Sequence, residues 1–162
     1  MKVIFKYSLK KEQEQVDWFE KNYSKEPIAF ILPKGKVKPI SQKNLQKNLT
    51  KIESEWNKIE KEFFEVIKKN ELQSENSYIC YLSRYGSSGF YELPNKLIIR
   101  IANRQDLSES NINIAHELAH LILHKNKKDL NLEFIDKERM VDDFLAQREF
   151  KKILPEYKKQ KF

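Results

Sequence analysis

The sequence places all three of its histidines in one stretch, NINIAHELAHLILH at residues 111–124. His116 and His120 are four residues apart, so on an α-helix their side chains lie one above the other and can converge on one ion. Zinc binds imidazole nitrogen at about 2.0 to 2.1 Å and, in catalytic sites, keeps one position for water. Glu117 directly follows the first histidine, where a carboxylate can act as general base toward that water. The pattern His-Glu-x-x-His therefore predicts a zinc centre for hydrolysis.

Two histidines leave such a centre one protein ligand short, and the third histidine does not complete it. His124 lies eight residues beyond His116, about 12 Å along the same helix axis, which is too far to share the ion. The metzincin pattern needs a histidine ten positions after the first, and Asn126 holds that place. Because Cys80 is the only cysteine, we expect a carboxylate as the third ligand.

Six carboxylates downstream of the histidines are candidates for this ligand: Asp129, Glu133, Asp136, Glu138, Asp142 and Asp143. Glu138 is favoured because it falls in the first turn of the last expected helix. Asp142 lies one turn later on the same face, where it can accept a hydrogen bond from a ligand histidine and fix its tautomer. The alternatives are a solvated Glu138 near a helix N-terminus and two surface histidines beside an exposed glutamate.

Length and composition favour one domain over residues 1–162. The chain is 40% hydrophobic and 12% aromatic, which supports one core and is too apolar for a disordered chain. The lone cysteine indicates a reducing compartment, and we find neither a signal peptide nor a membrane span, so we expect a cytoplasmic protein with no membrane partner. The formal net charge of +7 comes mostly from lysine. Lysine is typical of a solvated surface, and binding of nucleic acid is the weaker alternative.

Periodicity predicts an N-terminal part, residues 1–75, made of a β-α-β unit and a long helix. Its elements are a strand at 2–9, a helix at 10–23, a strand at 27–33 and one amphipathic helix from Ser41 to Asn70.

The active-site part is expected at residues 76–155. It contains strands at 77–85, 89–93 and 96–102, the histidine helix with its N-cap at Asp106 or Ser108, and a last helix from about Asp136 to Phe150. Residues 156–162 are expected to be a loose basic tail. The predicted fold class is α+β, with a small, mainly antiparallel sheet packed on a long backing helix and an active-site helix.

The segments HELAHLILH and ERMVDDFLA resemble the ImmA/IrrE family of small metallopeptidases. That family shows HELGHxxLH, then a glutamate, an Asn, Asp or Ser four residues later, and an aromatic residue two beyond that. Glu138, Asp142 and Phe144 fall on those places, and Ala119 stands where the family commonly has glycine. The resemblance covers about residues 78–155. Gluzincin-like peptidases are an equally fair comparison for this half of the chain.

The resemblance implies a zincin-like domain in which His116, His120 and Glu138 hold Zn²⁺ and Glu117 is the catalytic base. The implied activity is hydrolysis of peptide bonds, which we expect to act on a specific regulatory protein. Hydrolysis would be helped by a further hydrogen-bond donor to the oxyanion that forms on the substrate carbonyl. The candidates lie near the GSSG loop and are Arg84, Tyr85 and Tyr91. Two alternatives stay open: a vestigial metal-binding module that recognises a protein or nucleic acid, and a toxin-like effector that uses the same chemistry.

Overall fold

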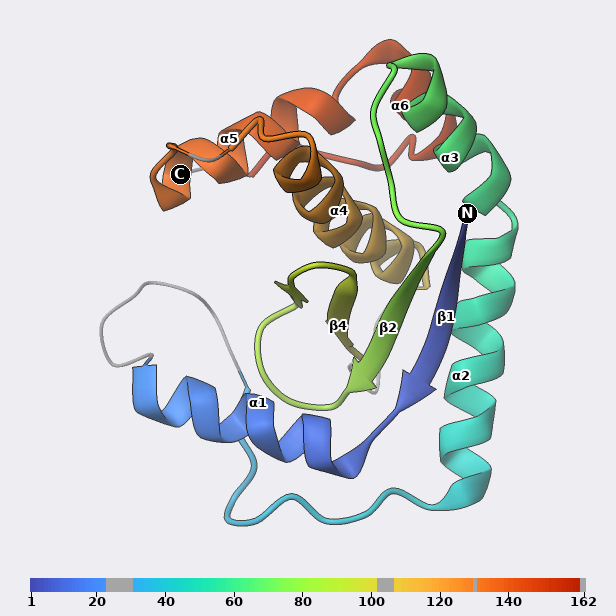
Figure 1. Cartoon of the computed structure of the whole chain (residues 1–162). Coiled ribbons are helices and arrows are strands. Elements are labelled where there is room, and N and C mark those ends of the chain that lie inside the picture. The colour runs from blue at the N-terminus through green and yellow to red at the C-terminus, as the bar shows by residue number, and fades with distance from the viewer. Residues whose placement is uncertain (23–30, 102–106, 130, 161–162) are drawn as a thin grey trace.

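The computed structural model describes residues 1–22, 31–101, 107–129 and 131–160 of the chain. In these residues it is an α+β protein, with one sheet and helices around it (Figure 1). The elements, in chain order, are β1 (Lys2–Tyr7), α1 (Leu9–Asn22), α2 (Gln42–Asn57), α3 (Glu60–Lys69), β2 (Ser77–Ser83), β3 (Gly89–Glu92), β4 (Lys96–Arg100), α4 (Leu107–Lys125), α5 (Phe134–Leu145) and α6 (Arg148–Ile153).

The sheet is mixed, so the expectation of a mainly antiparallel sheet was wrong. Its strand order is β1-β2-β4-β3. Strands β1, β2 and β4 pair in parallel, and only the β3–β4 hairpin is antiparallel. β4 lies between β2 and β3, although β3 comes earlier in the chain.

Burial explains why β4 takes the inner position. Leu97, Ile98 and Ile99 are at most 2% exposed, whereas every residue of β3 is partly exposed. A continuous apolar run suits a strand that is covered on both faces, which is typical of parallel pairing. A strand with mixed burial suits the edge, and β3 therefore forms one edge of the sheet.

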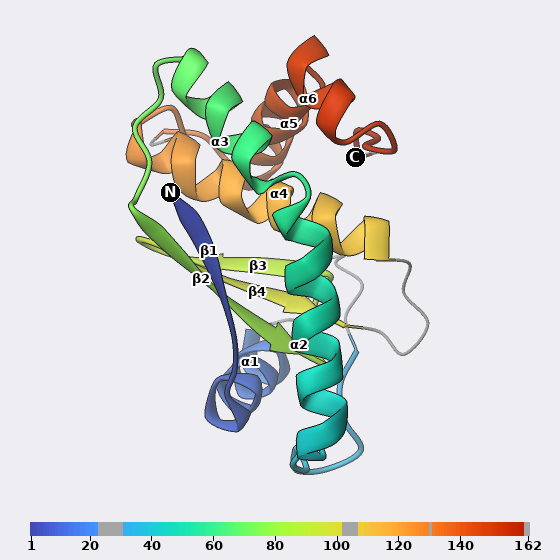
Figure 2. The same ribbon diagram turned by 90° about the vertical axis from the view of Figure 1, so that its right-hand side faces the viewer.

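Helices cover the two faces of the sheet, with α4 on one side and α1 on the other (Figure 2). α4 packs on β3 and β4 and contributes Ile114, Leu118 and Ile122 to the main core. Cys80 of β2 lies fully buried in this core, as expected of a strand residue. On the other face, the ring of Phe19 from α1 lies 6.4 Å from that of Phe90 in β3. The sheet thus holds α4 on a rigid surface.

The long helix predicted from Ser41 to Asn70 is two helices, α2 and α3, separated at Lys58 and Ile59. Glu60, the first residue of α3, lies directly after the break. Its Oε1 accepts hydrogen bonds from Trp56 Nε1 at 3.0 Å and from the backbone N–H of Val3 at 2.6 Å. This ties the junction to β1. The apolar spacing continues across the junction, so periodicity alone did not reveal it.

The last predicted helix is likewise divided, into α5 and α6, with the break at Ala146 and Gln147. The strand expected at 27–33 falls largely outside the described residues, and so does Asp106, one of the two expected N-caps. The other, Ser108, is not an N-cap, because α4 begins before it at Leu107. Of that strand, Ile31 forms an isolated bridge with Gly86. Among the described helices, none combines the length and apolar character needed to cross a membrane.

Candidate metal centre

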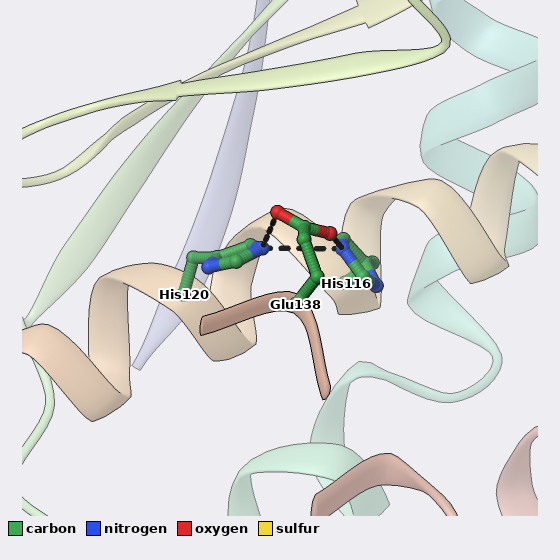
Figure 3. Close-up of side chains that lie close together, drawn as sticks. All are labelled: His116, His120 and Glu138. Carbon is green, nitrogen blue, oxygen red and sulfur yellow. Dashed lines mark hydrogen bonds and ion pairs between the residues drawn. The ribbon is translucent and has the colours of Figure 1, made fainter. Parts of the chain in front are cut away.

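Two neighbouring helices bring His116, His120 and Glu138 together (Figure 3). Both histidines project from α4 on the same face, as their spacing predicted. Glu138 reaches them from α5, 22 residues further along the chain. The two Nε2 atoms are 3.2 Å apart, and each lies 3.0 Å from one carboxylate oxygen of Glu138. In the described part of the chain, these three residues form the only group with metal-ligand geometry.

The distances among the three side chains fit a zinc ion. Ligand atoms at about 2.05 Å from a tetrahedral zinc are about 3.3 Å from one another. The 3.2 Å between the two Nε2 atoms is close to this value, and so is the 3.0 Å from each Nε2 to the nearer of the two Glu138 oxygens. Two imidazoles and a carboxylate are also the ligand types that zinc prefers. The chemistry and the spacing of the cluster therefore both suit a zinc site.

The electrostatics of the cluster favour a cation. Burial raises the pKa of Glu138, but hydrogen bonds from His116 and His120 outweigh it and hold this pKa at about 2. Burial lowers the pKa of His116, but the hydrogen bond with Glu138 and the nearby carboxylates raise it above its usual value. Both shifts favour a positive charge among these ligand atoms.

Glu117 is buried between α4 and the edge strand β3. Only 8% of the residue is exposed, and burial raises its pKa while the imidazoles of His116 and His120 partly lower it. Its carboxylate lies directly against Gly89 of β3. A Cβ atom at Gly89 would come within 2.3 Å of Glu117 Oε1. The sequence placed Gly89 at the end of a turn and the start of a strand, and its close approach to Glu117 was not predicted.

The three residues considered as oxyanion donors differ in their surroundings. Arg84 is engaged elsewhere, because its guanidinium pairs with the buried Glu12 at 2.6 Å, and it also lies over the Tyr85 ring. Tyr91 stacks on the imidazole of His120, with ring centroids 4.6 Å apart. Burial, together with nearby carboxylates, raises the pKa of Tyr91 to about 12, so its hydroxyl stays protonated at neutral pH. Of the three, Tyr91 is the one that contacts a residue of the cluster.

Asp142 does not contact a histidine directly; the two are linked through Tyr157. The Tyr157 hydroxyl donates to Asp142 Oδ1 at 2.5 Å and lies 3.4 Å from His116 Nδ1. Burial and Asp142 raise the pKa of Tyr157 well above its usual range. The backbone N–H of Gln160 donates to the other oxygen of Asp142 at 2.7 Å. Tyr157 and Gln160 are therefore bound to α5, within the segment 156–162 that was expected to be a loose tail; residues 161–162 lie outside the described residues.

The remaining carboxylate candidates lie apart from the cluster. Asp129 contacts His124 Nδ1 at 2.9 Å, Asp136 pairs with Arg139, and Asp143 pairs with Lys159. Glu133 is exposed. His124 is thus a helix-end residue with its own partner, in agreement with the prediction that it does not share the ion.

Comparison with known families adds independent information about this region. The Peptidase_M78 family model, described as the IrrE N-terminal-like domain, matches residues 66–150. The match spans 85 of the 162 residues and includes the two histidines of the cluster, Glu117 and Glu138. Neither the curated proteins nor the solved structures show a significant match to the chain.

Proposed function

Because the chain belongs to the Peptidase_M78 family, we propose that it is a zinc-dependent metallopeptidase with His116, His120 and Glu138 as ligands and Glu117 as general base. The observation that carries this proposal is the convergence of two imidazoles and a carboxylate beside a buried glutamate: the two Nε2 atoms are 3.2 Å apart, and each lies 3.0 Å from a different oxygen of Glu138. A purely structural metal site has no need of a glutamate at that position.

In the proposed mechanism, bound zinc supplies Lewis-acid chemistry, which polarises the scissile carbonyl and makes water acidic. Glu117 takes the proton from the attacking water and later donates it to the leaving amine. Its burial favours this role, because a raised pKa makes the carboxylate a stronger base. Tyr91 holds the His120 ring by stacking, and its protonated hydroxyl is a candidate donor to the oxyanion.

The substrate is proposed to be an extended peptide segment of a specific regulatory protein. β3 is an edge strand, so its outer backbone groups can pair with an added strand. The same strand touches Glu117 through Gly89, which supports pairing of a peptide beside the proposed base. The selectivity for one regulator is our expectation from the family resemblance.

The first test compares peptide hydrolysis by the zinc-loaded wild type and by Glu117→Gln, with a peptide library as substrate. The glutamine has nearly the same shape and is not a ligand, so zinc content should be unchanged. Loss of the general base should reduce the rate by about 10² to 10⁴-fold. Equal rates for both proteins would show that Glu117 is not the base. A wild type that holds zinc but cleaves no peptide, itself included, would favour the binding-module alternative.

A further inference from the structure

The segment that follows α6 returns to the proposed metal site and fastens on Asp142. Leu154 at the end of α6 is 4% exposed and anchors the segment in the core. Beyond it, the Tyr157 hydroxyl and the Gln160 backbone N–H each bind one oxygen of Asp142, at 2.5 and 2.7 Å. Both oxygens of this buried carboxylate are thus bonded by the C-terminal segment. These contacts fix the position of the Tyr157 ring beside α4.

The Tyr157 hydroxyl faces His116 as a hydrogen-bond acceptor. A phenol has one proton, and the 2.5 Å bond assigns it to the charged oxygen of Asp142. The hydroxyl oxygen then has only lone pairs to offer to His116 Nδ1, 3.4 Å away. This contact is favourable when Nδ1 carries a proton. A neutral imidazole carries only one proton, so Nε2 then has a free lone pair.

The tautomer of His116 matters because two acceptors compete for its proton. Glu138 Oε2 lies 3.0 Å from Nε2 and favours the tautomer with the proton on Nε2. That tautomer cannot bind a metal through Nε2, which is the atom that faces His120 and Glu138. Tyr157 offers the proton an acceptor on the opposite side of the ring. Its hydroxyl therefore stabilises the form of His116 that can act as a ligand.

We propose that Tyr157 is a positioning residue of the metal site, whose hydroxyl, oriented by Asp142, accepts the Nδ1–H of His116 and directs Nε2 to the ion. This inference rests on the proposed function. It concerns a residue beyond the family match, which ends at residue 150. Through this contact, the C-terminal segment acts directly on His116, the proposed ligand on α4.

The test measures zinc affinity by competition with a chelator for the wild type, Tyr157→Phe and a matched control, Tyr81→Phe. Tyr81 is also a partly exposed tyrosine, but it lies on strand β2 and not in the C-terminal segment. We expect Tyr157→Phe to weaken zinc binding about 10- to 100-fold and the control to leave it unchanged. Circular dichroism of each variant checks that the fold is retained.

A second measurement separates positioning from general support of the fold. Tyr157→Phe is combined with His116→Ala, which removes the ring on which the hydroxyl acts. If Tyr157 works through His116, its substitution should have no further effect on zinc affinity in that background. An equal loss in both backgrounds would overturn the proposal, and so would a Tyr157→Phe protein that binds zinc as tightly as the wild type. A wild type that binds no zinc would instead refute the proposed function itself, and this proposal with it.

Discussion

Glu117 is the residue on which hydrolysis depends in the proposed mechanism, and its surroundings set the pH range in which it works. Burial raises the pKa of its carboxyl above the usual 4.5, although His116 and His120 lower it in part. A general base must be ionised before it can accept a proton. Activity should therefore be lost as the pH falls through this raised pKa, and gained as the pH rises.

We accordingly predict that kcat/KM for peptide hydrolysis rises with pH through a value above 4.5. The measurement is a pH profile of the zinc-loaded protein, with zinc content determined at each pH. The zinc analysis is the control, because protonation of the ligand histidines would also abolish activity but would release the metal. A rate that stays constant down to pH 4.5 while zinc is retained would contradict the assignment of Glu117.

At the scale of elements, the edge strand β3 holds the proposed base in place. Gly89 leaves room for the Glu117 side chain, and an added methyl group would lie 2.3 to 2.9 Å from three of its atoms. Because Glu117 is buried, its carboxylate has little space into which to move. The neighbouring Tyr91, two residues further on the same strand, stacks on His120. One face of β3 thus contacts both the proposed base and a proposed ligand.

Gly89→Ala should displace Glu117 and lower peptide hydrolysis by about 10- to 100-fold. Zinc affinity should change little, since Gly89 contacts the base and not the ligands. Ser88→Ala is the matched control, because Ser88 is exposed and adjacent. The two readouts are steady-state rates and zinc titration on the same preparations. Unchanged hydrolysis by Gly89→Ala would show that this contact does not position Glu117.

Elements with a strong local pattern could be predicted from the sequence. The helix that carries His116 and His120 followed from its apolar spacing, and the choice of Glu138 followed from elimination and helical position. The structure brings these three side chains together. Local patterns work here because residues four apart on a helix share a face, whatever the rest of the fold does.

Contacts between segments that are distant in the chain leave no local pattern in the sequence, so they could not be predicted. Tyr157 meets His116 across 41 positions of the chain, so no periodicity links them. The parallel pairing of β4 with β2 also depends on which strand is buried on both faces, and the short apolar run LII at 97–99 was the only sign of it. Beside the break after α2, Glu60 accepts a hydrogen bond from Val3, 57 residues away along the chain, so the sequence pattern gave no sign of that contact either.

At the scale of the whole molecule, the proposed metal centre lies where several separate helices and the C-terminal segment meet. α4 lies on the sheet and also contacts α2 from the N-terminal part and α5, which carries Glu138. The C-terminal segment closes the arrangement from the other side of His116 through Tyr157. A bound ion would therefore link α4 to α5 directly. Glu138 is the only one of the three proposed ligands that α4 does not provide, so it would carry this link.

The most direct test of the account is the zinc affinity of Glu138→Ala compared with that of the wild type. Glu133→Ala is the matched control, since Glu133 is an exposed glutamate at the start of the same helix and makes no capping hydrogen bond. We predict one zinc ion per chain for the wild type and the control, and at least about a hundredfold weaker binding for Glu138→Ala. Unchanged zinc affinity in Glu138→Ala, or a wild type that binds no zinc, would contradict the account.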